Sequence, residues 1–147
     1  MKNKIILIVI IFMIILAVAG YYVINYRNSI IESQKINKQY ESYYNVQMLG
    51  TEMASLINKT MDINTKEFDI PKDENGLFIE NDTNSIKIYI NFKYKDDYRK
   101  IEMEKIFESG IENFIKTYST ASFKCTEINY HEKTNNVKEL TFTETED

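Results

Sequence analysis

The hydrophobic positions follow different patterns in successive parts of the chain. A continuous apolar run fills residues 5–24, and helically spaced apolar positions follow it up to about residue 61. Residues 86–94 then alternate apolar with polar positions, and residues 103–118 return to helical spacing. A period near 3.6 predicts helices and a period of 2 predicts a half-buried strand. The order of these patterns predicts an α+β protein that begins with an apolar helix.

The apolar run is long enough to cross a membrane. At about 1.5 Å per helical residue, residues 5–24 span roughly the 30 Å of a hydrocarbon core. Tyrosines and an arginine follow, at the depth where an aromatic belt and the lipid headgroups are expected; these are Tyr21, Tyr22, Tyr26 and Arg27. We therefore expect residues 5–26 to form a transmembrane helix that is retained as an anchor.

Cleavage of this segment is the alternative. Ala17, Val18 and Ala19 fit the small-residue site of a secretory signal peptide, so cutting after Ala19 would release an exported domain. The apolar run continues beyond Ala19, and it contains no Gly or Pro before that site. Both observations favour an uncleaved anchor.

Charge suggests the orientation and excludes some partners. All 22 acidic residues follow the apolar run, whereas two of the 18 basic residues, Lys2 and Lys4, precede it, so the remainder carries a net charge of −6. Basic residues beside the run favour residues 1–4 as a cytoplasmic tip and place the domain outside the cytoplasm; the inverted topology stays as the alternative. An acidic domain with interspersed signs argues against nucleic acid as a partner.

Beyond the membrane segment, the sequence predicts a stalk and one small domain. Residues 27–50 are predicted as a stalk helix with a tyrosine-rich face. Tyr40, Tyr43 and Tyr44 are expected to pack against the domain or against another subunit, and an aromatic patch that contacts a glycan or a partner is the alternative. The domain comprises residues 51–147 and starts with a helix that Thr51 caps. Its apolar face is predicted to enter the core; the residues are Met53, Leu56, Ile57 and Met61.

The rest of the domain is predicted as two hairpins and one amphipathic helix. Residues 77–79 and 86–94 form the first hairpin around the polar segment 81–85. The helix follows over residues 101–118 with Gly110 in its interior, where close approach to a sheet would compensate the cost of a glycine. The tail forms the second hairpin, with a bulge near Thr126 or Glu127 where the alternation changes parity. The fold expected is an antiparallel four-stranded sheet with helices against one face.

Candidate chemistry is sparse. His131 and Cys125 are the single residues of their kinds, so a standard zinc site cannot form within one chain. On one extended strand they would lie about 20 Å apart, far beyond hydrogen-bond reach, which argues against a Cys–His nucleophile pair. We interpret His131 as a solvated turn residue and Cys125 as a small strand residue, with an intermolecular disulfide or a reactive thiol as the alternatives for Cys125. The stretch "PKDENG" misses most EF-hand ligand positions and is predicted to be a turn. We therefore expect no catalytic, cofactor-binding or metal-binding residue, no cofactor, and no enzymatic activity.

Three stretches carry a resemblance: "GTEMASLINKTMDIN", "KDENGLFIENDTNSIKI" and "FKCTEINYHEKT". With them, the chain resembles a group of small single-pass membrane proteins from AT-rich Gram-positive bacteria, a resemblance that implies the topology and no activity. A basic tip, an apolar helix, a stalk and a sheet domain are also similar to pilins. However, "MKNKIILIVIIFMIIL" lacks the Gly and Glu of the pilin processing motif.

These observations favour a membrane-anchored extracytoplasmic domain that makes protein contacts, with the lipid bilayer as a partner through residues 5–26. A protein partner, or self-association through the stalk, is expected. The alternatives are an exported ligand-binding or enzymatic domain released after Ala19, and a pilin-like assembly subunit.

Overall fold

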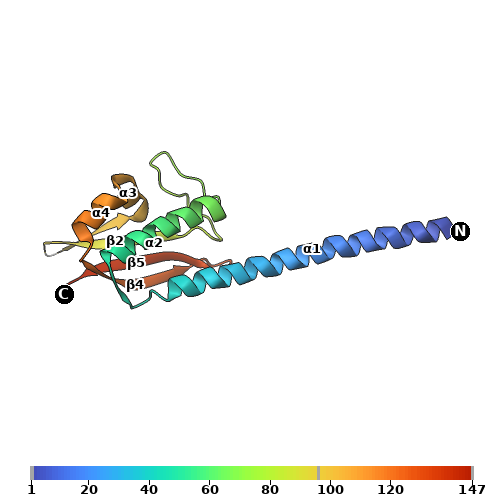
Figure 1. Cartoon of the computed structure of the whole chain (residues 1–147), viewed down its shortest axis with the longest axis horizontal. Coiled ribbons are helices and arrows are strands. Elements are labelled where there is room, and N and C mark those ends of the chain that lie inside the picture. The colour runs from blue at the N-terminus through green and yellow to red at the C-terminus, as the bar shows by residue number, and fades with distance from the viewer. Residues whose placement is uncertain (1, 96, 147) are drawn as a thin grey trace. The chain divides into compact units, whose positions relative to one another are not determined.

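The structure is a computed structural model that describes residues 2–95 and 97–146 (Figure 1). The chain divides into two compact units, residues 1–36 and 37–147. Helix α1, Lys2–Glu41, accounts for nearly all of the first unit and contributes its last residues to the second. The second unit contains a mixed sheet and the remaining helices.

Helix α1 is apolar enough and long enough to cross a membrane, with a mean hydropathy of 2.9 over its most apolar window. The large apolar side chains of residues 5–24 are all exposed within the chain. Exposed apolar surface of this extent is unfavourable in water and favourable in lipid. The helix ends at Glu41, whereas the stalk helix was expected to extend to residue 50. A short strand, β1 (Gln47–Leu49), begins six residues after the helix ends.

The sheet has five strands in the order β1-β4-β5-β2-β3. The longer strands are β2 (Lys87–Tyr94), β3 (Asp97–Glu102), β4 (Ser122–Tyr130) and β5 (Val137–Thr145). Strands β2 and β5 pair in parallel, and the other neighbours pair antiparallel. The α+β class is confirmed, whereas the expected antiparallel four-stranded sheet is wrong in both strand number and direction. The predicted bulge is confirmed, because the register of β4 against β5 shifts between Cys125 and Glu127.

The first predicted hairpin is wrong. Phe78 makes only an isolated bridge to Lys72, and β2 pairs instead with β3 and β5. Strand β3 was not predicted from the sequence. It lies at the edge of the sheet and begins Asp97-Tyr98-Arg99-Lys100, so it shows no alternation of apolar and polar residues. Charged side chains are common on edge strands, where they discourage pairing with other chains.

Three α-helices cover one face of the sheet, as Figure 1 shows for α2, α3 and α4. Helix α2 is Gly50–Asp62, and a π-helical turn, η1 (Ile63–Glu67), extends it. The single amphipathic helix expected over residues 101–118 is in fact two helices, α3 (Met103–Ser109) and α4 (Ile111–Tyr118). Gly110 separates them with a φ of +96°, a conformation that disfavours any residue with a Cβ atom.

The core lies between these helices and the sheet. Ile88 and Ile90 of β2 face the same side as their register partners Leu140 and Phe142 of β5, and all four are fully buried. The predicted apolar face of α2 is buried as expected. Tyr40 near the end of α1 is also fully buried, and its hydroxyl lies 2.8 Å from the Thr60 hydroxyl of α2. This contact confirms the predicted packing of Tyr40, whereas Tyr44 is exposed.

Candidate functional site

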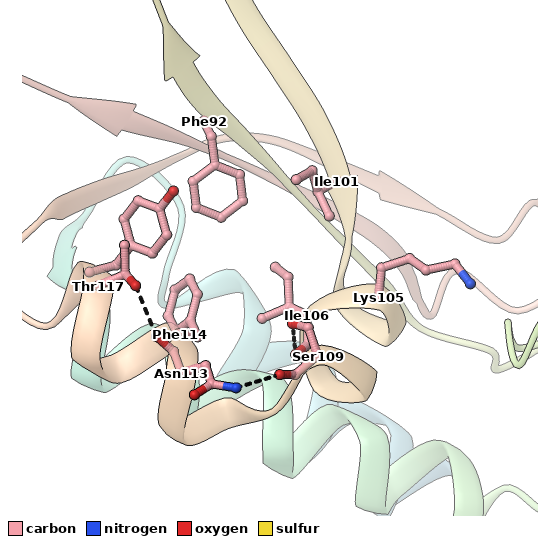
Figure 2. Close-up of a pocket in the computed structure, with 9 residues that line it drawn as sticks. Phe92, Ile101, Lys105, Ile106, Ser109, Asn113, Phe114 and Thr117 are labelled. Carbon is pink, nitrogen blue, oxygen red and sulfur yellow. Dashed lines mark hydrogen bonds between the residues drawn. The ribbon is translucent and has the colours of Figure 1, made fainter.

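A groove of about 500 Å³ opens between the sheet and helices α3 and α4 (Figure 2). Phe92 and Ile101 descend into it from strands β2 and β3. The opposite side is formed by residues of α3 and α4, and these are Lys105, Ile106, Ser109, Asn113, Phe114, Thr117 and Tyr118. Its helical side comes from two short helices, because Gly110 separates α3 from α4.

Aromatic side chains form the inner wall of the groove. The Phe92 ring lies 4.8 Å from the Tyr118 ring and 6.2 Å from the Phe114 ring, centroid to centroid. Phe123 of β4 lies behind them, with its centroid 5.9 Å from that of Phe92. These separations are typical of edge-to-face and tilted aromatic contacts, which are rigid and strongly apolar. The wall is therefore suited to an apolar group.

The rim of the groove is polar, and its helical side is held by hydrogen bonds. Asn113 donates its amide to the Ser109 carbonyl at 2.8 Å, and the Thr117 hydroxyl donates to the Asn113 carbonyl at 3.0 Å. The Lys105 ammonium donates to the Asn75 carbonyl at 2.9 Å and lies 3.3 Å from a Glu108 carboxylate oxygen. An apolar wall with a few polar groups at the rim is the usual composition of a binding pocket.

A second hollow, of about 510 Å³, lies between the last turn of α1 and strand β4. Its lining has two carboxylates and two phenols and no basic side chain: Glu41, Tyr44, Thr126, Glu127, Ile128 and Tyr130. The Tyr130 hydroxyl donates to the Glu41 carboxylate at 3.1 Å. Burial, and then this contact with Glu41, raise the pKa of Tyr130 above its ordinary value, so the phenol stays protonated at neutral pH.

A buried ion pair lies outside both hollows. The Lys87 ammonium of β2 is 2.9 Å from Oε1 of Glu104 in α3, and both side chains are almost inaccessible to solvent. The same oxygen accepts a hydrogen bond from the Phe78 backbone N–H at 3.2 Å. Glu104 Oε2 is buried and has no hydrogen-bond partner among the described residues. The pair attaches the segment around Phe78 to the sheet, and we interpret its role as structural.

The prediction for His131 is wrong, because its side chain is buried rather than solvated. Its Nε2 lies 2.8 Å from the Ser85 carbonyl, in a segment 46 residues earlier in the chain. Cys125 is a buried strand residue as predicted, and burial raises the pKa of its thiol to about 11. "PKDENG" contains a turn in which Asp73 accepts hydrogen bonds from the N–H groups of Asn75 and Leu77.

Among residues 2–95 and 97–146, no group of three or more His, Cys, Asp or Glu side chains is placed to hold a metal ion. Sequence reasoning found neither hollow, because each is lined by residues from elements that only the fold brings together. Comparison with protein families, with curated proteins and with solved structures finds no match for this chain.

Proposed function

We propose that this chain is a membrane-anchored protein whose domain lies outside the cytoplasm and binds a partner protein, without catalysing a reaction. The apolar surface of α1 supports the anchor. The observation that carries the binding role is the groove between the sheet and α3–α4, whose inner wall is formed by the buried rings of Phe92 and Phe114 and the half-buried ring of Tyr118. A groove with an apolar wall and a polar rim is typical of a binding site.

The occupant that we propose is an apolar side chain from an extended segment of the partner. The groove lies beside β3, an edge strand whose outer side pairs with no strand among the described residues. The Tyr98 backbone N–H donates instead to the Asp97 carboxylate at 2.8 Å. An added strand would supply main-chain hydrogen bonds to this edge and direct alternate side chains into the groove.

Photocrosslinking from the full chain in its own membrane tests this proposal. A benzophenone amino acid is placed at Thr117, which lines the groove, or at Lys116, which is exposed on the same helix and does not. We expect a protein adduct of one reproducible mass from position 117 and none from 116. The substitution Ser109→Trp, which fills the groove from α3, should abolish that adduct. Equal adducts from both positions, or an adduct that survives Ser109→Trp, would contradict the proposal.

A second candidate is an exported ligand-binding domain, released by cleavage after Ala19. The groove also favours this candidate, because its volume of about 500 Å³ is within the range of small-molecule pockets. N-terminal sequencing of the mature protein separates the two. A mature chain that begins at Gly20 supports release, whereas the intact N-terminus in the membrane fraction supports the anchor. A pilin-like subunit, the third candidate, predicts filaments on the cell surface.

A further inference from the structure

We infer that the hollow between α1 and β4 is a binding site for an arginine side chain on an extended peptide segment. This site is separate from the groove at α3–α4 and is independent of the role proposed for that groove. It is carried by the composition of the lining, the geometry of β4 and the absence of any basic residue from that lining.

Charge complementarity fixes the sign of the ligand. Glu41 and Glu127 place two carboxylates in a hollow whose lining contains no Lys, Arg or His. Glu127 accepts a hydrogen bond from the Asn129 side-chain amide at 3.2 Å, and Glu41 accepts one from the Tyr130 hydroxyl at 3.1 Å. Both contacts are with neutral donors, so the negative charge remains uncompensated within the lining. A cation is therefore the complementary ligand.

The rest of the lining selects the kind of cation. Tyr44 and Tyr130 contribute aromatic rings, and Ile128 contributes an apolar side chain. An arginine guanidinium stacks on aromatic faces and donates two parallel hydrogen bonds to a carboxylate, whereas a lysine ammonium is a strongly hydrated point charge. A hollow with two phenols and two carboxylates therefore suits arginine better than lysine.

Strand β4 supplies the backbone partner that favours a peptide over a free cation. Strand β1 pairs only with Ser122–Lys124 of β4, and an isolated bridge joins Tyr44 to Cys125. On the side away from β5, no strand pairs with residues 126–130 among the described residues. An exposed strand edge offers unpaired N–H and C=O groups to an added strand, and the hollow lies along this stretch of edge.

Binding of a labelled peptide to the full chain in detergent micelles tests the inference. The probe is fluorescein–Val-Thr-Arg-Thr-Val-amide, and the control carries citrulline, which keeps the shape of arginine without its charge. We expect the citrulline peptide to bind at least about tenfold more weakly, because its uncharged side chain forms no charge-assisted hydrogen bonds with Glu41 and Glu127, and the lysine peptide to fall between the two. Equal binding of the arginine and citrulline peptides would overturn the inference.

Matched variants locate the site. Glu127→Gln should weaken binding of the arginine peptide about five- to tenfold, and Tyr44→Leu about threefold. Glu132→Gln removes the same charge from an exposed residue outside this hollow, and it should leave binding unchanged. Equal losses for Glu127→Gln and Glu132→Gln would show non-specific attraction and overturn the assignment. Agmatine, a free guanidinium compound, should compete poorly; competition as strong as that of the peptide would overturn the role of β4.

Discussion

Lys87 and Glu104 form an ion pair of 2.9 Å beneath the surface, between strand β2 and helix α3. Two charges are costly to bury, and one carboxylate oxygen of the pair, Oε2, has no hydrogen-bond partner in the part of the chain that the structure describes. The other oxygen also accepts the Phe78 N–H, so a single side chain connects the sheet, α3 and the segment that precedes β2.

Glu104→Gln should destabilise the domain by about 3 kcal/mol, because it leaves the Lys87 ammonium buried without a counter-charge. Lys87→Met should cost a similar amount, since it leaves the carboxylate uncompensated. The double variant keeps an amide oxygen for the Phe78 N–H and buries no charge, so it should be more stable than either single variant. Urea unfolding in micelles measures the stability of the wild-type chain, the two single variants and the double variant. Additive single effects would contradict a coupled pair.

Gly50 begins helix α2 where this helix approaches the end of α4. A Cβ atom at this position would lie 1.8 Å from the Tyr118 carbonyl oxygen, and the Gly50 N–H donates to the Ala121 carbonyl at 2.9 Å. Gly50→Ala should therefore force a backbone shift and cost about 2–3 kcal/mol.

Gly20→Ala is the matched control for that substitution, because a Cβ atom there meets no described atom within 4 Å. The unfolding midpoint of the domain, followed by near-ultraviolet circular dichroism, should fall for Gly50→Ala and stay constant for Gly20→Ala. An unchanged midpoint for Gly50→Ala would show that α2 and α4 do not approach as closely as the structure indicates.

The elements that were predicted correctly are those in which burial of one face imposes a regular spacing on the apolar residues. The apolar face of α2 and the alternation of β2 are both visible in the chain, because hydrophobic burial sets the spacing of these residues. Which strands pair with each other was not predictable from periodicity. Strand β2 has a polar segment before it that resembles a hairpin turn, yet Asn81 there accepts hydrogen bonds from the N–H groups of Thr83, Asn84 and Ser85 and forms a local loop.

The candidate sites depend on contacts that no local pattern encodes. His131 was predicted to be solvated in a polar turn, but the fold buries its side chain, and its Nε2 forms a hydrogen bond with the carbonyl of Ser85, 46 residues earlier in the chain. The groove at α3–α4 is lined from two helices that are separated at Gly110, and a glycine inside a helical stripe does not by itself indicate whether the helix ends there. The hollow at β4 forms where the end of α1 lies beside a strand that begins more than 80 residues later in the chain. Only the tertiary structure shows this contact.

Alkaline pH should weaken the fold through the phenols of Tyr40 and Tyr89. Burial raises the pKa of Tyr40 above its ordinary value of 10.0, and it raises that of Tyr89 to about 12. The folded state therefore holds these protons more tightly than the unfolded state, so this stability is complete below about pH 10 and is lost as the pH rises further. Urea midpoints measured from pH 8 to 12 should fall above pH 10.

Tyr40→Phe separates the contribution of Tyr40 from the others. At pH 8 it should cost about 1 kcal/mol, because the hydrogen bond with Thr60 is lost. Above pH 10 the variant should lose stability less steeply than the wild-type chain, since one shifted group has been removed. Parallel pH profiles for the two chains would show that Tyr40 does not titrate with unfolding.

Cys125 should react slowly with maleimides in the folded chain. The thiol is buried, it lies 3.6 Å from the Glu127 carbonyl oxygen, and burial raises its pKa to about 11, so the reactive thiolate is scarce at pH 7.5. Mass spectrometry should detect almost no adduct under native conditions and one adduct in urea. Rapid native labelling would show that strand β4 opens readily.

This low reactivity makes a single introduced cysteine a direct reporter of topology. Glu112 is exposed in the first turn of α4, so Glu112→Cys should react with a maleimide while Cys125 does not. If the domain lies outside the cytoplasm, a membrane-impermeant maleimide added to intact cells should label Glu112→Cys as completely as it does after permeabilisation. The unsubstituted chain supplies the background in both conditions. Labelling that requires permeabilisation would place the domain in the cytoplasm and reverse the proposed orientation, which rests on Lys2 and Lys4 lying directly beside the apolar run.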